Sequence, residues 1–487
     1  MDIASRRVLV DWEKIYKSGY PKSVSVNKGH SSIYQISQDW FFKRKQQDGN
    51  YGPDSMQINN RSSIVQYFHS MGSFNNQVPF SQHHFVYNEF KGCLEDFAEV
   101  FCYTVSKGLG IVKKTDVYGR TFDAPVVDVA EYKLAEYKDQ NGVLQRGVLS
   151  RNIVGENDEL IQGDFLLKFL REGSIGSNLP NYLRAINAYA DTMGIMIDPN
   201  LQRDLIVNSF FCWKVTNTDN HRNNITFIQT KGPDGTPYIK VSPLIDNGGA
   251  YDSSSTYHLK DSNTSMYKVK FQKELGTDDV TPEQAAQTIF TENRFIQNTA
   301  FKLGAGDLYG HPKTLNETPM EYEYDLAAYA LSNPDIYSSI FQIEQNFDMA
   351  AAASEMAKEY GIKWPEYYLE AMHACDGYKS NVLSQVMADC FCHTAYTSCI
   401  GEVNMENPDA LYLAFQEQMI GLPLQESVDG YIQEFMKLAN QANVPVDQAT
   451  LETLNFLPEQ GQPMEQPAEQ PAEQPALTLV KELPPQQ

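Results

Sequence analysis

A predicted helix that runs into a β-hairpin between residues 199 and 249 constrains the fold of this chain more than any other feature. The helix over 199–215 carries apolar residues on one face and stops at Thr216-Asn217-Thr218-Asp219, where short polar side chains compete for backbone hydrogen bonds. The segments ITFIQT and PYIKVSPLI then read as two strands joined by a turn. A hairpin brings its open ends together, so Asn224 and Asp246 should be neighbours, with Asp219 one loop away.

Two carboxylates and an amide in this arrangement suit phosphoryl transfer, whose transition state is stabilised by positioning and charge neutralisation. Asp219 suits the group that accepts the proton of the attacking hydroxyl. Asn224 and Asp246 offer oxygen atoms to Mg²⁺, which prefers oxygen ligands. Asn247-Gly248-Gly249 would give the segment a flexible exit. The alternative is that these residues form an ordinary polar loop and turn.

The pattern along the chain predicts an α+β protein in three parts. Residues 1–153 read mostly as short strands with one inserted helix, residues 154–458 read mostly as helices with one strand pair, and residues 459–487 hold the repeat QPMEQPAEQPAEQPA. We therefore expect a small β-rich lobe, a larger helical lobe and a disordered tail.

Several local elements are predicted inside these parts. Strands are expected at SSIYQIS and DWFFKRK, and at EYKLAEYKD and VLQRGVLSRNIV around Asn141-Gly142; helices are expected at 93–107, 159–171, 179–193 and 199–215.

Composition narrows the functional class. The net charge of −23 and a pI of about 4.8 argue against nucleic-acid binding, which needs clustered Lys and Arg. No apolar run approaches the ~18–20 residues that span a membrane, and the N-terminus has no signal-peptide pattern, so we expect a cytoplasmic protein without a membrane partner.

Seven sparse cysteines predict reduced thiols rather than a disulfide framework. One cluster of cysteines and histidines has spacings that allow two interpretations; it comprises His373, Cys375, Cys390, Cys392, His393 and Cys399. One is a structural zinc site. The other, which we favour, is a set of buried thiols in a helical hairpin.

The pattern D-x-H-x-x-N, followed by a hairpin and P-x-x-D, resembles the HipA-like kinases, a family that includes bacterial toxins. Asp219, His221, Asn224, Pro243 and Asp246 match it position by position. The resemblance implies a bilobal protein-kinase-like fold, with ATP and Mg²⁺ as cofactors, Asp219 as catalytic base, and Asn224 and Asp246 as magnesium ligands.

The resemblance extends upstream to Trp40-Phe41-Phe42-Lys43 and to a helix with an acidic residue. It implies that Lys43 contacts the α- and β-phosphates and that Glu99 orients Lys43. Lys45, on the same strand face, is the fallback for the lysine, and Glu95 competes with Glu99.

Two more segments are candidates for contacting the nucleotide. The turn at 27–32, with Gly29, Ser31 and Ser32, offers backbone amides to phosphate. The stretch Gly147 to Asn152, with Ser150, resembles the family's link between the lobes, where backbone would meet adenine; a plain edge strand is an equal alternative.

The predicted function is ATP-dependent phosphorylation of a protein Ser or Thr. The resemblance also implies a toxin acting on a translation enzyme, with an antitoxin protein as a second partner. Ser31 and Ser32 are candidate autophosphorylation sites, because their hydroxyls lie in the expected phosphate loop. Three alternatives stay open: a small-molecule or lipid acceptor, AMP transfer, and a non-catalytic nucleotide-binding protein. Residues 300–455 match no motif.

Overall fold

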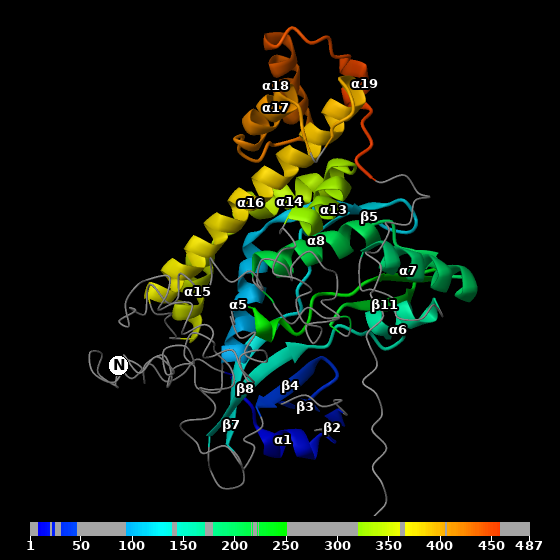
Figure 1. Ribbon diagram of the computed structural model, residues 1–487. Helices are drawn as coiled ribbons and strands as arrows, with labels where there is room; N and C mark the ends of the chain where they lie inside the picture. Colours follow the sequence, from blue (N-terminus) through cyan, green and yellow to red (C-terminus); the bar gives the residue numbers. More distant parts are fainter. Residues whose placement is uncertain are drawn as a thin grey trace, which may run out of the picture.

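The N-terminal part of the chain forms a six-stranded sheet in the order β1-β7-β8-β4-β3-β2 (Figure 1). The computed structural model describes residues 8–19, 22–24, 31–45, 94–138, 144–170, 179–215, 217, 222, 224–250, 320–360, 366–404 and 407–457. The six strands are β1 Val8–Leu9, β2 Lys22–Val24, β3 Ser31–Gln35, β4 Trp40–Lys45, β7 Tyr132–Lys138 and β8 Leu144–Arg151. The two antiparallel pairs predicted from sequence, β3 with β4 and β7 with β8, are confirmed.

A second sheet has the order β10-β12-β11-β9, and a separate hairpin joins β5 to β6. These strands are β5 Ile111–Thr115, β6 Thr121–Pro125, β9 Glu159–Gln162, β10 Met196–Ile197, β11 Thr226–Lys231 and β12 Pro237–Val241. The predicted hairpin of β11 and β12 is confirmed, with Phe227 opposite Val241.

The described helices fall before, between and after these sheets. They are α1 Trp12–Lys17, α5 Leu94–Gly108, α6 Gly163–Phe169, α7 Leu179–Met193, α8 Leu201–Lys214, the 3-10 turn η2 Asn247–Gly249, α13 Met320–Leu331, α14 Pro334–Asn346, α15 Met349–Tyr360, α16 Glu366–Cys399, α17 Ala410–Ile420, α18 Val428–Gln441 and α19 Gln448–Glu452. The mixed α+β class predicted from the sequence is therefore confirmed. The lobe boundary at 153 stays a prediction, and the tail from 459 lies outside the described residues.

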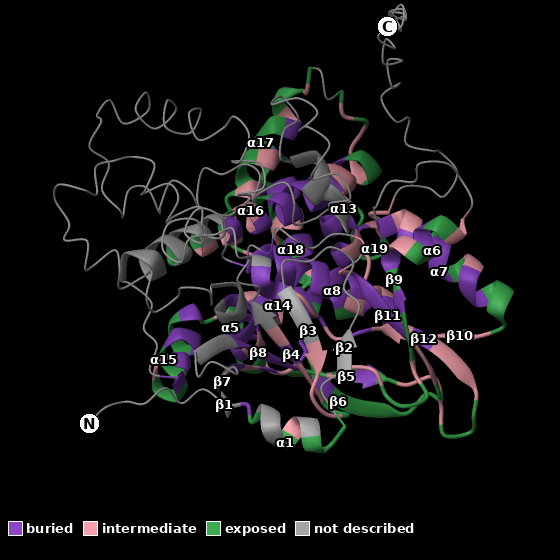
Figure 2. Cartoon of the chain, turned by 90° about the horizontal axis from the view of Figure 1, so that it is seen from below, coloured by how far each residue is buried: buried purple, intermediate pink, exposed green. Residues whose placement is uncertain are grey.

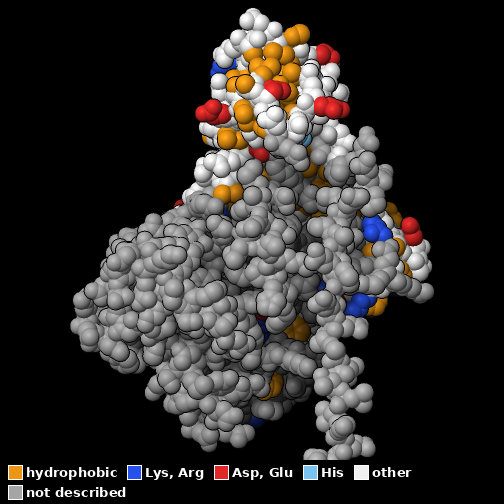
Figure 3. Space-filling view, in the orientation of Figure 1, with side chains coloured by type: hydrophobic (Ala, Val, Ile, Leu, Met, Phe, Trp, Pro, Cys, Tyr) orange, Lys and Arg blue, Asp and Glu red, His pale blue; other side chains and the backbone are white. Residues whose placement is uncertain are grey.

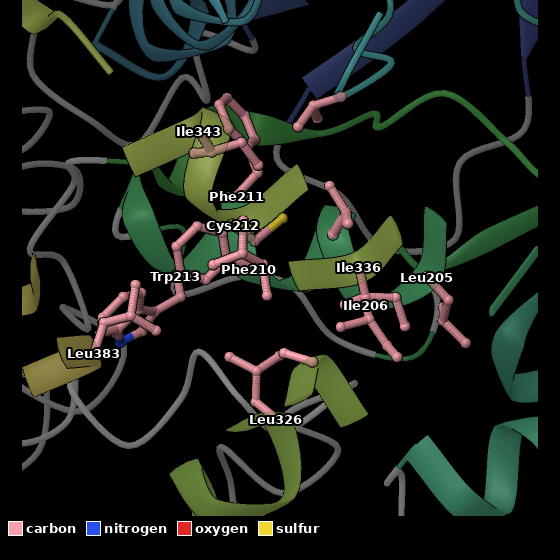
Figure 4. Packing of buried hydrophobic residues seen from close by; sticks show 14 of the residues in the cluster. Leu205, Ile206, Phe210, Phe211, Cys212, Trp213, Leu326, Ile336, Ile343 and Leu383 are labelled. Atoms are coloured by element: carbon pink, nitrogen blue, oxygen red, sulfur yellow. The ribbon is translucent and has the colours of Figure 1, made fainter. Parts of the chain in front are cut away.

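Helix α8 lies in the middle of the main hydrophobic core. Its buried residues Phe210, Phe211 and Trp213 pack with residues of α13, α14 and α16 (Figure 4). Almost every residue of α8 is buried, so this helix is enclosed on all sides rather than on one face. Figure 2 shows the same distribution, with buried residues at the centre and exposed ones on β5, β6 and the outer helices. The end of α8 is therefore held by packing from several elements.

The expected helix at 159–171 is shorter than predicted. Residues 159–162 form strand β9, paired antiparallel with β11, and α6 begins only at Gly163. A Cβ atom at Gly163 would lie 2.8 Å from the Tyr182 ring and 2.9 Å from the Arg222 carbonyl oxygen, so the chain needs glycine at this crossing. Long-range pairing with β11 overrides the local helical pattern here.

The cysteine and histidine cluster lies on one helix rather than on a helical hairpin. His373 and Cys390 both belong to the continuous helix α16, so a rise of ~1.5 Å per residue separates them by about 25 Å. They therefore cannot ligate one ion. Cys390 and Cys392 are buried, reduced thiols.

The helices α17 to α19 form the end of the molecule opposite the six-stranded sheet (Figure 1). At this end Figure 3 shows hydrophobic side chains at the surface between acidic ones. Among the described helices, none combines the length and apolar character that a membrane crossing requires.

Candidate functional site

Three charged side chains from distant parts of the chain meet between the sheet and the helices. Lys43 Nζ on β4 lies 2.5 Å from Glu99 Oε1 on α5 and 2.9 Å from Asp246 Oδ1 after β12. The side chain of Glu99 is 1% exposed, that of Lys43 is 17% exposed and that of Asp246 is 41% exposed. The cluster is thus closed on the side of Glu99 and open on the side of Asp246.

The sheet fixes the position of Lys43. Its backbone lies opposite Ile33 of β3 on one side and Val148 of β8 on the other. The neighbouring Gly147 allows β4 and β8 to approach, since a Cβ atom there would lie 2.2 Å from the Lys43 carbonyl oxygen. Lys43 therefore projects from an interior strand with pairing on both edges.

Asp246 is held by its backbone in an unusual conformation. Its φ of 58° and ψ of 49° lie in the left-handed region, which non-glycine residues seldom adopt. Its N–H donates to the Tyr132 hydroxyl oxygen over 3.0 Å. Two residues earlier, Leu244 N–H donates to the Asp128 carbonyl oxygen over 2.7 Å. This segment is therefore anchored on the chain leading into β7, and the left-handed turn at Asp246 redirects the chain into η2.

The residues after Asp246 do not form the flexible exit expected from Asn247-Gly248-Gly249. They form η2, which packs against α5, and Asn247 is fully buried. Asn217 Nδ2 donates to Asn247 Oδ1 over 3.2 Å, so η2 is tied to the segment that follows α8. Packing and a side-chain hydrogen bond thus fix a stretch whose composition favours flexibility.

The electrostatics of the cluster favour a charged lysine. Burial by itself lowers the pKa of Lys43, but the carboxylates of Asp246 and Glu99 outweigh this effect and raise its pKa well above the usual value. Burial raises the pKa of Tyr132, whose ring lies 5.9 Å from Lys43 Nζ, so its hydroxyl stays protonated. The site therefore presents a permanent cation beside one buried and one accessible carboxylate.

The hairpin brings Asn224 toward the same region. Ser242 N–H donates to the Thr226 carbonyl oxygen over 3.0 Å. The pairing of β11 and β12 therefore continues to within a few residues of Asn224 and Asp246, which were predicted to be neighbours. Asn224 is partly buried just before β11. Asp219 and His221 lie outside the described residues, and the role of Asp219 stays a prediction.

The sequence left two choices open: Lys43 or Lys45 as the phosphate-binding lysine, and Glu99 or Glu95 as the glutamate that orients it. Lys43, rather than Lys45, is the β4 lysine whose ammonium contacts are described, because the side chain of Lys45 lies outside the described residues. Likewise, the contacts of the Glu99 side chain are described, whereas the side chain of Glu95 lies outside the described residues. The roles assigned to Lys43 and Glu99 stay predictions.

The other residues predicted to contact the nucleotide, Gly29, Ser31, Ser32 and Ser150, do not all fall in one place in the structure. Gly29 lies outside the described residues, whereas Ser31 and Ser32 are the first residues of β3 and pair with β4. Ser150 is buried in β8, which lies between β4 and β7. The edge-strand interpretation of 147–152 is therefore wrong. The chain leaves the sheet after Arg151, the last residue of β8, although the N–H of Asn152 still donates to the Asp39 carbonyl oxygen over 2.7 Å.

Sequence reasoning gave no role at this site to Tyr132, and it treated Asn217 and Asn247 only as a helix stop and a flexible exit. Tyr132 is the second residue of the predicted strand EYKLAEYKD, and a strand pattern does not indicate which group a side chain will meet. Asn217 and Asn247 stand beside the recognised motif, and their hydrogen bond joins two loops that local patterns cannot relate.

No protein-family model matches the chain, and no curated protein matches it in sequence. Among solved structures, the chain is similar to the crystal structure of a Helicobacter pylori proinflammatory kinase, CtkA, with 13% sequence identity and a TM-score of 0.38. The superposition covers 75% of this chain and 92% of the other. A TM-score at this level does not establish a common fold, so the chemistry of the site must follow from its own residues.

Proposed function

We propose that this chain binds Mg-ATP at the cluster of Lys43, Glu99 and Asp246 and transfers the γ-phosphoryl group to a protein hydroxyl. The observation that carries the proposal is the position of Lys43 Nζ between a buried glutamate and an accessible aspartate. A lysine held by a helix glutamate, beside an aspartate that ends a hairpin, is the arrangement that places a cation on phosphates and a carboxylate on magnesium in kinases.

The donor set fits magnesium. Asp246 presents a carboxylate that is 41% exposed. Asn224, just before β11, would add an amide oxygen from the other end of the hairpin. Mg²⁺ is usually held by one or two protein carboxylates together with phosphate oxygens, so a larger group of protein ligands is not needed. Bound there, the ion would neutralise charge on the phosphates.

The protein groups would then have separate tasks. Lys43 would bind phosphate oxygens while Glu99 holds its ammonium in place. Asp219, two residues after Asn217, would accept the proton of the acceptor hydroxyl. At the same time the hydroxyl oxygen would bond to the γ-phosphorus, and the bond from that phosphorus to the leaving ADP oxygen would break. The segment after Arg151 is the candidate for meeting adenine. The toxin role and an antitoxin partner depend on the resemblance alone and stay predictions.

The test is a transfer assay with ATP labelled in either the γ- or the α-phosphate, using a cell lysate as acceptor. We expect γ-label on protein with the wild type, and none with Asp219→Ala. α-Label on protein would indicate AMP transfer, and γ-label on small molecules or lipids would indicate another acceptor class. Absence of both labels from every fraction would overturn the proposal.

A further inference from the structure

A buried group of charged side chains encloses the last turn of α8. Lys214 Nζ lies 2.8 Å from Glu344 Oε1 on α14, 2.5 Å from Asp376 Oδ1 on α16, and 2.8 Å from Ser380 Oγ on α16. Lys379 Nζ, also on α16, donates to the backbone carbonyl oxygen of Trp213 and lies 3.5 Å from that of Lys214. Lys214 and Lys379 are almost fully buried.

Lys379 contacts the backbone at the end of α8, and its ammonium also lies 5.3 Å from the centre of the Trp213 ring. The last carbonyl groups of a helix lack partners within the helix and carry partial negative charge. A buried ammonium at this point therefore caps the C-terminus of α8. Among the described residues, Lys214 and Lys379 lie with Glu344 and Asp376, so two positive charges stand against two negative ones and the members stabilise one another.

The capped end of α8 leads directly to the candidate site. Asn217, three residues after Lys214, donates its N–H to the Cys212 carbonyl oxygen over 2.8 Å. Its side chain donates to Asn247, which follows Asp246. The end of α8 is thus joined by hydrogen bonds to the segment that carries Asp246, and Asp219 comes five residues after Lys214 in the sequence.

We infer that Lys379 is a positioning residue: by capping α8 it holds Asn217, which joins the end of α8 to the segment that carries Asp246. The inference rests on the proposed function, because it assigns that segment to catalysis. It also gives a task to helix α16, which lies in the part of the chain without a recognisable motif.

The experiment compares Lys379→Met with the wild type for kcat, for the KM of ATP and for unfolding by urea. We expect kcat to fall about 10- to 100-fold, as small displacements of catalytic groups do. The KM of ATP should change less than kcat does, because Lys43 and Glu99, which are held by other elements, still contact the nucleotide. Lys437→Met, at an exposed lysine on α18 paired with Glu434, is the matched control and should leave all values unchanged.

A double variant separates positioning from stability. Lys379→Met leaves the buried group with one excess negative charge, and adding Asp376→Asn restores neutrality without restoring the cap. We expect the double variant to regain stability but not kcat. If kcat returned together with stability, Lys379 would act only through folding and the inference would be wrong.

Two further measurements decide the matter if Lys379→Met does not fold or the wild type transfers no phosphate. Ser380→Ala removes hydrogen bonds to Lys214 and Glu344 without altering charge, and we expect kcat to fall roughly two- to tenfold. Hydrogen exchange in the peptide ending at Asn217 should be at least about tenfold faster in the Lys379 or Ser380 variant. Unchanged exchange would overturn the positioning role, whereas a wild type without transfer would overturn the proposed function alone.

Discussion

The ammonium nitrogen of Lys43 and the Oδ1 atom of Asp246 lie 2.9 Å apart, although 203 positions separate them in the chain. This contact joins a strand of the first sheet to the end of the hairpin that follows α8. Because Lys43 also contacts Glu99, it links three elements. An incoming phosphate and metal would replace the contact between Lys43 and Asp246, while Glu99 keeps the lysine in place.

The first prediction concerns the stability of this cluster. Lys43→Met should lower the free energy of unfolding by about 3 kcal/mol, because it leaves the buried Glu99 without its cation. Adding Glu99→Gln should recover most of this loss. Urea denaturation measures both. The control is Lys133→Met, at a partly exposed lysine paired with Glu131, which is expected to cost less than about 1 kcal/mol. A Lys43→Met loss no larger than the control would show that the pair is not buried as described.

The second prediction concerns pH. The pKa of Lys43 is raised in the folded protein, so its contribution to stability is fully present below its unfolded pKa of about 10.4 and is lost as pH rises through the higher folded pKa. The difference in unfolding free energy between wild type and Lys43→Met should therefore be constant from about pH 7 to 10 and shrink above that. A decline already between about pH 7 and 9 would contradict a raised pKa.

The third prediction uses a glycine beside Lys43. A Cβ atom at position 147 would lie 2.2 Å from the Lys43 carbonyl oxygen and 2.8 Å from the Phe42 ring, so Gly147→Ala must displace β4. We expect a loss of about 1–3 kcal/mol in unfolding free energy and weaker ATP binding. Gly108→Ala, at the end of α5 where a Cβ atom meets nothing within 4 Å, is the matched control and should be neutral or slightly stabilising. Equal effects of both substitutions would refute the steric account.

Local patterns in the sequence were sufficient for much of the fold. Alternation and turn residues predicted the pairs β3–β4, β7–β8 and β11–β12, and helical periodicity predicted α5, α7 and α8. These signals work because the relevant contacts are close in sequence. Strand β9 was missed because its partner β11 lies more than sixty residues away, and its short apolar run fits a helix equally well.

The same distinction applies to the site. Lys43, Glu99 and Asp246 were named because each stands in a recognisable pattern. The roles of Tyr132, Asn247 and Lys379 were not predicted, because they come from contacts made only after folding. These contacts are a hydroxyl that accepts from a backbone amide, a buried pair of side-chain amides, and an ammonium at a helix end. Lysine in particular reads as a surface residue in sequence, and burial of Lys379 could not be inferred from its neighbours.

The most direct test of the central claim is calorimetric binding of ATP to the wild type and to Asp246→Asn, with Mg²⁺ and with EDTA. Asparagine suits this purpose because it tolerates the left-handed backbone at position 246. We predict that EDTA weakens ATP binding to the wild type at least about tenfold, and that binding to Asp246→Asn is insensitive to Mg²⁺. A wild type that binds no ATP, or an Asp246→Asn variant with the full magnesium dependence of the wild type, would contradict the account.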